Sequence, residues 1–467
     1  MTQDDMRTAV YAALRAWSDQ AGTQKNLLED LLLVRAKREG INGNGPAAYR
    51  LAANQVLLDG IEILRKQNAE SARLLTARFL DGEKIQKVAN RLYLSTDQVK
   101  RRQRDAITGL TDIIGGQETA LRQKKAHSLK SQLIPATYRQ LFGIASKKQA
   151  LVKKLLLEDA PWIVALVGIG GIGKTSLADA ALREAVDYFA YQQLIWLRIE
   201  KSDGLKSSPE RWNQLLSQLA EKMLLDLTSV TSITERYAQL RQILKTVPSL
   251  IVIDNLESET DAAYFVERLH DLANPSKFLL TTRVRLPETA AVWTVFLEEL
   301  SRADSFKLIN HHAQSIGLAE LAQAEESILQ PIYEAIGGNP LALKLVVGLA
   351  LVLPLPQILK NLISVQHNAI EEMYRDIFWQ SWQSLSENGR ILLEIMPMAA
   401  DIGMTPEQLL AVSSLDEQYL WTAITELANR SLLEVRGTAW ERRYGIHRLT
   451  ETFLRTEIIH WPQEITS

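Results

Sequence analysis

The sequence feature that most constrains the fold is a glycine-rich stretch, "GIGGIGKT", between two segments that look ordered. The apolar run before it, "WIVALV", predicts a buried strand, and the amphipathic run after it, "KTSLADAALREAV", predicts a helix. Glycine costs a strand or a helix backbone entropy, so four glycines within six residues require a reason at this junction. A loop that leads into the first turn of a helix is a natural anion site, because the backbone N–H groups there point at the ligand.

The stretch from Gly168 to Thr175 matches the pattern G-x-x-x-x-G-K-[ST] of a phosphate-binding loop. Lys174 would reach the β- and γ-phosphates of a nucleotide, and the Thr175 hydroxyl would bind Mg²⁺. The residues that we expect to hold the nucleotide here are Gly168, Gly170, Gly171, Ile172, Gly173, Lys174, Thr175 and Ser176. The alternative is a glycine turn with an accidental lysine, but the flanking strand and helix favour the phosphate loop.

Between residues 135 and 295, short apolar runs alternate with longer amphipathic ones, which predicts a parallel sheet buried on both faces. The expected strands are "WIVALV", "QQLIWLRI", "SLIVID", "KFLLTT" and "VWTVFL". Asp254 ends the third run, and we expect it on a strand neighbouring the phosphate-loop strand, where it would hold Mg²⁺ rather than cap a turn. Asn255 follows, and an amide is a poor base, so we expect at most slow ATP hydrolysis unless Glu257 helps.

The order of these motifs resembles the NB-ARC type of STAND P-loop NTPases, a group that includes apoptosome-forming proteins, plant disease-resistance proteins and bacterial regulators. The resemblance of "KFLLTTR" implies that Arg283 senses the γ-phosphate, and that of "GGNPLAL" implies that Pro340 packs beside the nucleotide. Asn339 and Pro340 are also ordinary residues for the start of a helix. The resemblance of "YGIHRL" implies that His447, on a winged-helix domain, contacts the β-phosphate of ADP.

The same resemblance implies ATP or ADP with Mg²⁺ as cofactors, and a switch. Bound ADP would hold a closed monomer, and exchange for ATP would open it and allow self-association. The resemblance covers about residues 135–460, and it has departures. Gly143 is followed by Ile144 and Ala145 where the family usually has arginine and glutamate, and Arg448 stands where aspartate is common.

Residues 1–115 show helical periodicity, with a helix-turn-helix signal at about residues 83–110. The helix "IQKVANRL" is followed by a tight break, and Ser95 with Gln98 forms a capping box that predicts a new helix from Thr96. The segment resembles sigma-factor region-four and response-regulator DNA-binding modules. The residues that we expect to contact duplex DNA are Thr96, Gln98, Lys100, Arg101, Arg102 and Arg104. The alternative is a helical adaptor whose basic residues form only a solvated face.

Composition limits the remaining choices. The net charge of −2 excludes a molecule that binds nucleic acid over its whole surface, and the lack of cysteine excludes disulfides and thiol catalysis. The longest apolar run, "LVVGLALVLPLP", is too short to span a bilayer and the amino terminus is not that of a signal peptide, so we expect a cytoplasmic protein without a membrane partner.

We therefore expect a multidomain α plus α/β protein, in which a parallel-sheet P-loop nucleotide domain is flanked by an all-helical N-terminal domain and by C-terminal helical and winged-helix domains. The expected parts are a helical domain 1–115, a basic linker 116–134, a nucleotide domain 135–295, a helical domain 296–375 and a winged helix 376–467. The expected function is a nucleotide-gated transcription regulator. The alternatives are a defence or cell-death type signalling scaffold and a plain ATPase, and Asn255 argues against the last.

Overall fold

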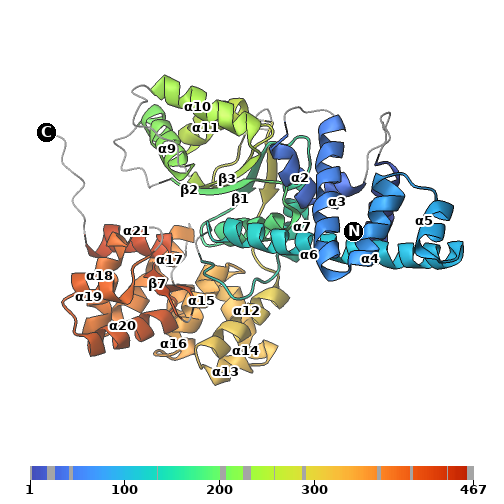
Figure 1. The fold of residues 1–467 in the computed structure, drawn as a ribbon. Helices are drawn as coiled ribbons and strands as arrows, with labels where there is room; N and C mark the ends of the chain where they lie inside the picture. The colour runs from blue at the N-terminus through green and yellow to red at the C-terminus, as the bar shows by residue number, and fades with distance from the viewer. Residues whose placement is uncertain are drawn as a thin grey trace. The chain divides into compact units, whose positions relative to one another are not determined.

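The computed structural model describes residues 3–17, 27–41, 46–133, 135–199, 207–223, 233–256, 258–286, 291–364, 370–399, 403–438 and 440–459. The chain divides into two compact units, Met1–Leu129 and Lys130–Ser467, and each is described by itself (Figure 1). Among the described helices, none is long and apolar enough to cross a membrane.

The first unit is built from helices around one apolar core, as its periodicity predicts. Its helices are α1 (Gln3–Arg15), α2 (Leu32–Glu39), α3 (Pro46–Gln67), α4 (Ala69–Leu75), α5 (Ile85–Leu92) and α6 (Thr96–Lys130). The core gathers apolar side chains from α1, α2, α3 and α6, among them Val10, Leu57 and Leu110. The described part of this unit contains no strand.

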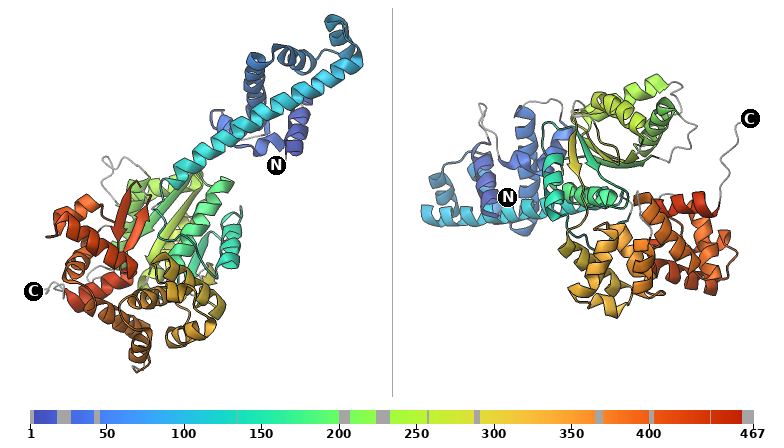
Figure 2. Two further views of the ribbon diagram at one scale, coloured as in Figure 1. Left: turned by 90° about the horizontal axis from the view of Figure 1, so that it is seen from below. Right: turned by 180° about the vertical axis from the view of Figure 1, so that it is seen from behind.

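The segment expected as a basic linker, residues 116–134, continues helix α6 as far as Lys130 (Figure 2). A tertiary contact holds this part of the helix in place. The carboxylate of Glu118 accepts the backbone N–H groups of Leu32 and Leu33 at 3.0 Å each. A carboxylate at a helix N-terminus satisfies amides that lack a partner within the helix. Because Glu118 is only 4% exposed, the middle of α6 belongs to the packing of the first unit.

The segment at residues 83–110, which we expected to be a helix-turn-helix, contains helix α5 and the start of α6 with a short break between them. Helix α5 ends at Tyr93, which has the left-handed φ of 54°, and α6 starts at Thr96 as predicted. The predicted capping box is confirmed, because the Ser95 N–H donates to Gln98 Oε1 at 2.9 Å and the Gln98 N–H donates to Ser95 Oγ at 3.2 Å. A small core that includes Val88, Ala89 and Val99 packs these helices together.

The second unit contains a five-stranded parallel sheet with the strand order β2-β3-β4-β1-β5. The strands are β1 (Ile163–Val167), β2 (Gln193–Arg198), β3 (Ser249–Leu256), β4 (Lys277–Thr282) and β5 (Trp293–Phe296). Each coincides with a predicted apolar run, and β1 and β4 are buried at every residue. The prediction that β3 neighbours β1 is wrong, because β4 lies between them.

Helices cover both faces of this sheet, as parallel strands require. On one face, α9 (Ser208–Lys222), α10 (Ile233–Thr246) and α11 (Glu259–Leu272) form a core with the strands through Trp212, Leu240 and Phe265 (Figure 1). On the other side, α8 (Lys174–Ala185) packs on the strands and on α7 (Ala145–Leu155). The hydroxyl of Tyr138 ties the segment before α7 to α8 by donating to Asp179 Oδ2 at 2.6 Å.

The rest of the unit is helical, with a β-hairpin before the last described α-helix. Its helices are α12 (Arg302–Ser315), α13 (Ala319–Ala322), α14 (Glu326–Ile336), α15 (Pro340–Leu349), α16 (Leu355–Ser364), α17 (Ile370–Gln383), α18 (Glu387–Ile395), α19 (Pro406–Val412), α20 (Glu417–Asn429) and α21 (Arg448–Phe453). In the β-hairpin, β6 (Glu434–Gly437) pairs antiparallel with β7 (Arg442–Gly445).

One apolar core runs from Leu300 to Leu454, so the segments expected as separate helical and winged-helix domains are packed on each other. A close approach joins them at Gly348 of α15. A β-carbon at this position would lie 2.6 Å from the backbone oxygen of Arg430 and 2.8 Å from its Cα. The contact therefore requires a residue without a side chain.

Candidate functional site

The glycine loop between β1 and α8 has the geometry of a preformed anion site. Gly171 and Gly173 have φ values of 72° and 98°, in the left-handed region that glycine adopts without strain. Lys174 is the first residue of α8, and its Nζ donates to the backbone oxygens of Gly168 at 2.8 Å and of Ile169 at 2.9 Å. The lysine ammonium thus lies across the loop, beside the N-terminus of α8, where positive charge and backbone N–H groups favour a phosphate.

The loop is also closely packed around Gly168, Gly170 and Gly171. A β-carbon on Gly170 would lie 3.0 Å from Arg283 Nη2, and one on Gly171 would lie 2.9 Å from Leu341 Cβ. Ile172, at 4% exposure, anchors the loop in the apolar interior. Thr175 and Ser176 follow as the second and third residues of α8. The structure therefore brings Arg283 and the start of α15 to the phosphate loop.

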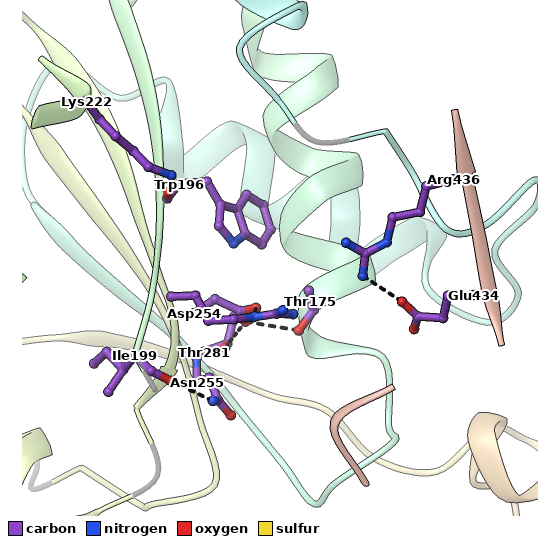
Figure 3. Close-up of polar contacts among 10 residues, drawn as sticks. Thr175, Trp196, Ile199, Lys222, Asp254, Asn255, Thr281, Glu434 and Arg436 are labelled. Carbon is purple, nitrogen blue, oxygen red and sulfur yellow. Dashed lines mark hydrogen bonds and ion pairs between the residues drawn. The ribbon is translucent and has the colours of Figure 1, made fainter. Parts of the chain in front are cut away.

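Asp254, which is 2% exposed, accepts hydrogen bonds from two threonines at the carboxyl end of the sheet. The Thr175 hydroxyl donates to its Oδ1 at 3.0 Å and the Thr281 hydroxyl donates to the same oxygen at 2.5 Å (Figure 3). Arg198, its register neighbour on β2, places Nε 3.5 Å from Asp254 Oδ2. A hydroxyl and a carboxylate side by side are the oxygen donors that Mg²⁺ prefers, so Thr175 and Asp254 fit the metal role that we expected.

The order of the strands explains why Arg283 reaches the loop. Strand β4 lies between β1 and β3, and its carboxyl end carries Thr281 and then Arg283. The carboxyl ends of parallel strands meet at one edge of a sheet, where ligands of α/β proteins bind. Arg283 therefore lies at the same edge of the sheet as the glycine loop and Asp254.

The side chain of Asn255 forms a hydrogen bond to the backbone in this structure. Its φ is 79°, a conformation that asparagine tolerates better than most residues, and it lies where the register of β3 and β4 shifts. The side-chain Nδ2 donates to the backbone oxygen of Ile199 at 3.0 Å, and the backbone N–H donates to Thr281 Oγ1 at 2.9 Å. Glu257, the other group considered for hydrolysis, lies outside the described residues.

Pro340 is the first residue of α15, and Asn339 is its N-cap. The Asn339 side-chain oxygen accepts the N–H groups of Leu341 at 3.1 Å and of Ala342 at 3.4 Å. Its side-chain nitrogen donates to the backbone oxygen of Gly170 at 2.9 Å. Asn339 thus caps the N-terminus of α15 and also forms a hydrogen bond to the phosphate loop.

His447 is the N-cap of α21, and its Nδ1 accepts the N–H of Leu449 at 3.1 Å. The neutral ring must then carry its proton on Nε2, which makes that nitrogen a donor. Burial lowers the pKa of His447, the Glu434 carboxylate opposes this, and the charges of Arg198, Lys344 and Arg283 lower the pKa further. The pKa of this histidine therefore depends on one carboxylate and three cationic groups.

A second contact supports this placement of the C-terminal segment. A β-carbon on Gly170 would lie 3.4 Å from Leu449 Cδ1, two residues after the histidine. The hairpin adds a carboxylate, Glu434, whose Oε2 lies 2.7 Å from Arg436 Nη2 (Figure 3). Burial alone would raise the pKa of Glu434, but the charges of Arg436, His447 and Arg198 hold it below its usual value. The described site therefore combines groups from the loop after β1, from α8 and α15, from the ends of β2, β3 and β4, and from the C-terminal hairpin and the start of α21.

The residues expected to contact DNA belong to the first unit, whereas the residues of this site belong to the second. Thr96 starts α6, Gln98 is engaged in the capping box, Lys100 pairs with Asp97 at 2.9 Å, and Arg102 pairs with Glu70 at 3.3 Å. Arg101 and Arg104 are exposed, and within the described part of the chain neither forms an ion pair.

Sequence reasoning missed four side chains of the site: Arg198, Thr281, Tyr374 and Glu434. Two of them carried a signal, because a polar residue at the carboxyl end of a buried parallel strand faces the ligand edge of the sheet. Arg198 ends "LIWLR" and Thr281 ends "KFLLT". Tyr374 and Glu434 come from a helix and a hairpin far along the chain, where no local pattern points to the phosphate loop.

Comparison with known proteins agrees with this geometry. Residues 144–315 match the NB-ARC domain family. A putative disease resistance protein of Arabidopsis thaliana is 25% identical over 248 residues, which are 50% of this chain and 26% of that protein. The disease resistance-like protein DSC1 of the same plant is 27% identical over 219 residues, 46% of this chain and 17% of that protein. The chain thus matches about a quarter or less of the length of these relatives.

Among solved structures, a STAND protein with a tetratricopeptide repeat sensor from Pyrococcus horikoshii is similar. It is 19% identical, with a TM-score of 0.44, and the similarity covers 69% of this chain and 43% of that one.

Proposed function

We propose that this protein is a signal-transduction switch that binds ATP or ADP with Mg²⁺ at the glycine loop. The proposal rests on the match of residues 144–315 to the NB-ARC domain and on the fit of the site to a nucleotide. Lys174 and the N-terminus of α8 supply positive charge for phosphates, and Thr175 with Asp254 supplies oxygen ligands for the metal. The bound metal would neutralise phosphate charge; the chain itself positions the phosphates and excludes water.

The observation that carries a switch, rather than a plain nucleotide site, is the presence of the C-terminal segment at the loop. His447 is coupled electrostatically to Arg283, and Leu449 lies against Gly170. A hydrogen bond from His447 Nε2 to a β-phosphate would exist only while this segment is docked. Ligands shift an equilibrium between two conformations only through their different affinities for them, and ADP would favour the docked form.

The C-terminal elements support a winged helix as the docked part. Helices α18, α19 and α20 precede the hairpin of β6 and β7, and Met404, just before α19, forms an antiparallel bridge with Tyr444 of β7. In the proposed mechanism, ADP holds this part closed in a monomer, and exchange for ATP opens it and allows self-association. Arg283 would then contact the γ-phosphate, and hydrolysis would be slow because Asn255 cannot act as a base.

The test of this function is the nucleotide that the purified protein carries. After denaturation, chromatography of the released small molecules should find ADP at close to one per chain, and added ATP should convert a monomer into larger species in sedimentation. Release of no nucleotide, together with no binding of added ADP, would reject the proposal. Steady turnover near the enzyme median of about 10 s⁻¹ would favour a plain ATPase instead.

We further propose that the first unit is the output of the switch, through duplex DNA at residues 83–110. The helix-turn-helix spacing and the exposed Arg101 and Arg104 support this reading. The alternative is a signalling scaffold whose helical front part recruits or acts as an effector. The plant disease resistance relatives favour that alternative, because their names describe defence rather than transcription.

Changes at Arg101 and Arg104 should separate these outputs. The full chain should bind duplex DNA with strong salt dependence, and each lost phosphate contact should reduce the slope of log K against log salt by about 0.9. Replacing both arginines with alanine should therefore flatten the slope by about 2. Gel retardation and fluorescence anisotropy across a salt series would measure this, with Arg7→Ala/Arg65→Ala as a control that removes equal charge from other helices. No retardation of any duplex at low salt would favour the scaffold.

A further inference from the structure

The backbone oxygen of Gly170, in the middle of the phosphate loop, is held by two buried side chains from later in the chain. Asn339 Nδ2 donates to it at 2.9 Å, and the Tyr374 hydroxyl lies 3.3 Å from it. The same hydroxyl lies 2.5 Å from Asn339 Oδ1. Asn339 is fully buried and Tyr374 is 3% exposed, so water does not compete for these bonds.

The hydroxyl of Tyr374 has one proton, and the shorter distance indicates that it goes mainly to Asn339. Asn339 Oδ1 then accepts from this hydroxyl and from the N–H groups of Leu341 and Ala342. Three donors around one oxygen fix which end of the amide is oxygen. The amide nitrogen is thereby directed at Gly170, so Tyr374 acts on the loop through Asn339.

Holding the Gly170 oxygen fixes the direction of the next amide. In a trans peptide the C=O and the N–H point to opposite sides, so the Gly171 N–H points away from Asn339. The oxygens of Gly168 and Ile169 behave differently, because they face the ammonium of Lys174. If the peptide between Gly170 and Gly171 were reversed, its oxygen would face the phosphate site and repel an anion.

We propose that Asn339, oriented by Tyr374, is the positioning residue that keeps the Gly170–Gly171 peptide turned with its N–H toward a β-phosphate. Helix α17, which carries Tyr374, would control nucleotide affinity through Asn339. The inference rests on the proposed nucleotide site and adds a second link between that site and the C-terminal helices, independent of His447. Tyr374 lies on α17, in the same core as the winged-helix elements, with its ring stacked on Phe378 at 6.2 Å and Phe378 stacked on Phe453 of α21 at 5.5 Å. Movement of these helices would withdraw the hydroxyl and release the amide.

The test compares ADP with AMP, because AMP lacks the β-phosphate that the positioned amide serves. Tyr374→Phe and Asn339→Ser should each weaken ADP binding by about 3- to 10-fold, the value of one neutral hydrogen bond, and leave AMP binding nearly unchanged. Serine at position 339 still caps α15 and is too short to reach Gly170. Because Tyr374 acts through Asn339, the double variant should bind ADP no more weakly than Asn339→Ser alone.

The matched control is Tyr333→Phe, which removes a hydroxyl from α14 for which the described residues provide no hydrogen bond. Its ADP and AMP affinities should equal those of the unaltered chain. Equal losses for ADP and AMP in the Tyr374 variant would indicate a loosened fold and overturn the inference, as would unchanged ADP binding or additive losses in the double variant. Failure of the unaltered chain to bind ADP would instead reject the proposed function.

Discussion

Lys174→Ala should weaken the binding of both ATP and ADP by about 10²- to 10⁴-fold. The lysine ammonium lies across the loop within hydrogen-bond distance of two of its backbone oxygens, and it is the point charge available to the β- and γ-phosphates. Two hydrogen bonds to charged groups contribute about 1.5–3 kcal/mol each, so their loss costs about 3–6 kcal/mol, and 1.4 kcal/mol is a factor of ten in affinity. Titration calorimetry with each nucleotide would measure the loss.

Lys153→Ala provides the control for this change. Lys153 is an exposed residue of α7 outside the loop, so its removal changes the net charge equally without touching the site. Its nucleotide affinity should remain that of the unaltered chain. Undiminished affinity in Lys174→Ala would show that the glycine stretch is a turn and not a phosphate loop.

His447→Ala should accelerate ADP release by about 10- to 100-fold and favour the open form. A hydrogen bond from a neutral imidazole to a charged phosphate contributes about 1.5–3 kcal/mol, and it exists only in the closed form. The alanine also removes the N-cap of α21, because His447 Nδ1 accepts the N–H of Leu449. His447→Ser separates the two effects, since serine caps the helix but cannot reach a phosphate.

Arg283→Ala should shift the same equilibrium in the opposite direction. It removes the proposed γ-phosphate contact and leaves ADP binding largely intact, so ATP affinity and ATP-dependent association should fall. Stopped-flow ADP release and sedimentation of both variants would check the pair. An ADP off-rate that is unchanged in both His447→Ala and His447→Ser would remove the histidine from the site.

The nucleotide-domain fold could be predicted because its signals are local. A run such as "KFLLTT" is buried on both faces, and it coincides with β4 at both ends. Strand order is not local, because any of several buried strands can pair with β1. The position of β4 between β1 and β3, and with it the approach of Arg283 to Gly170, could not be read from apolar runs.

The same distinction separates the parts of the site. The loop from Gly168 to Thr175 is contiguous in sequence, so its motif predicts it. Tyr374, in contrast, contacts Gly170 from 204 positions away in the sequence. The expected linker illustrates the converse error. Its composition is polar and basic, but Glu118 within it is buried against the N-terminus of α2 through the folding of the first unit. A polar composition shows that a segment could be exposed to solvent, but tertiary contacts determine which of its residues are buried.

Helix α15 can be considered as a strut. Its first turn touches the phosphate loop through Asn339, and Gly348, about 12 Å further along its axis, lies against the backbone of Arg430. A helix resists compression, so α15 sets the distance between the phosphate loop and the backbone of Arg430. At its far end no side chain separates the helix from that backbone. The absence of a side chain at position 348 therefore lets the far end of α15 rest directly on the backbone of Arg430.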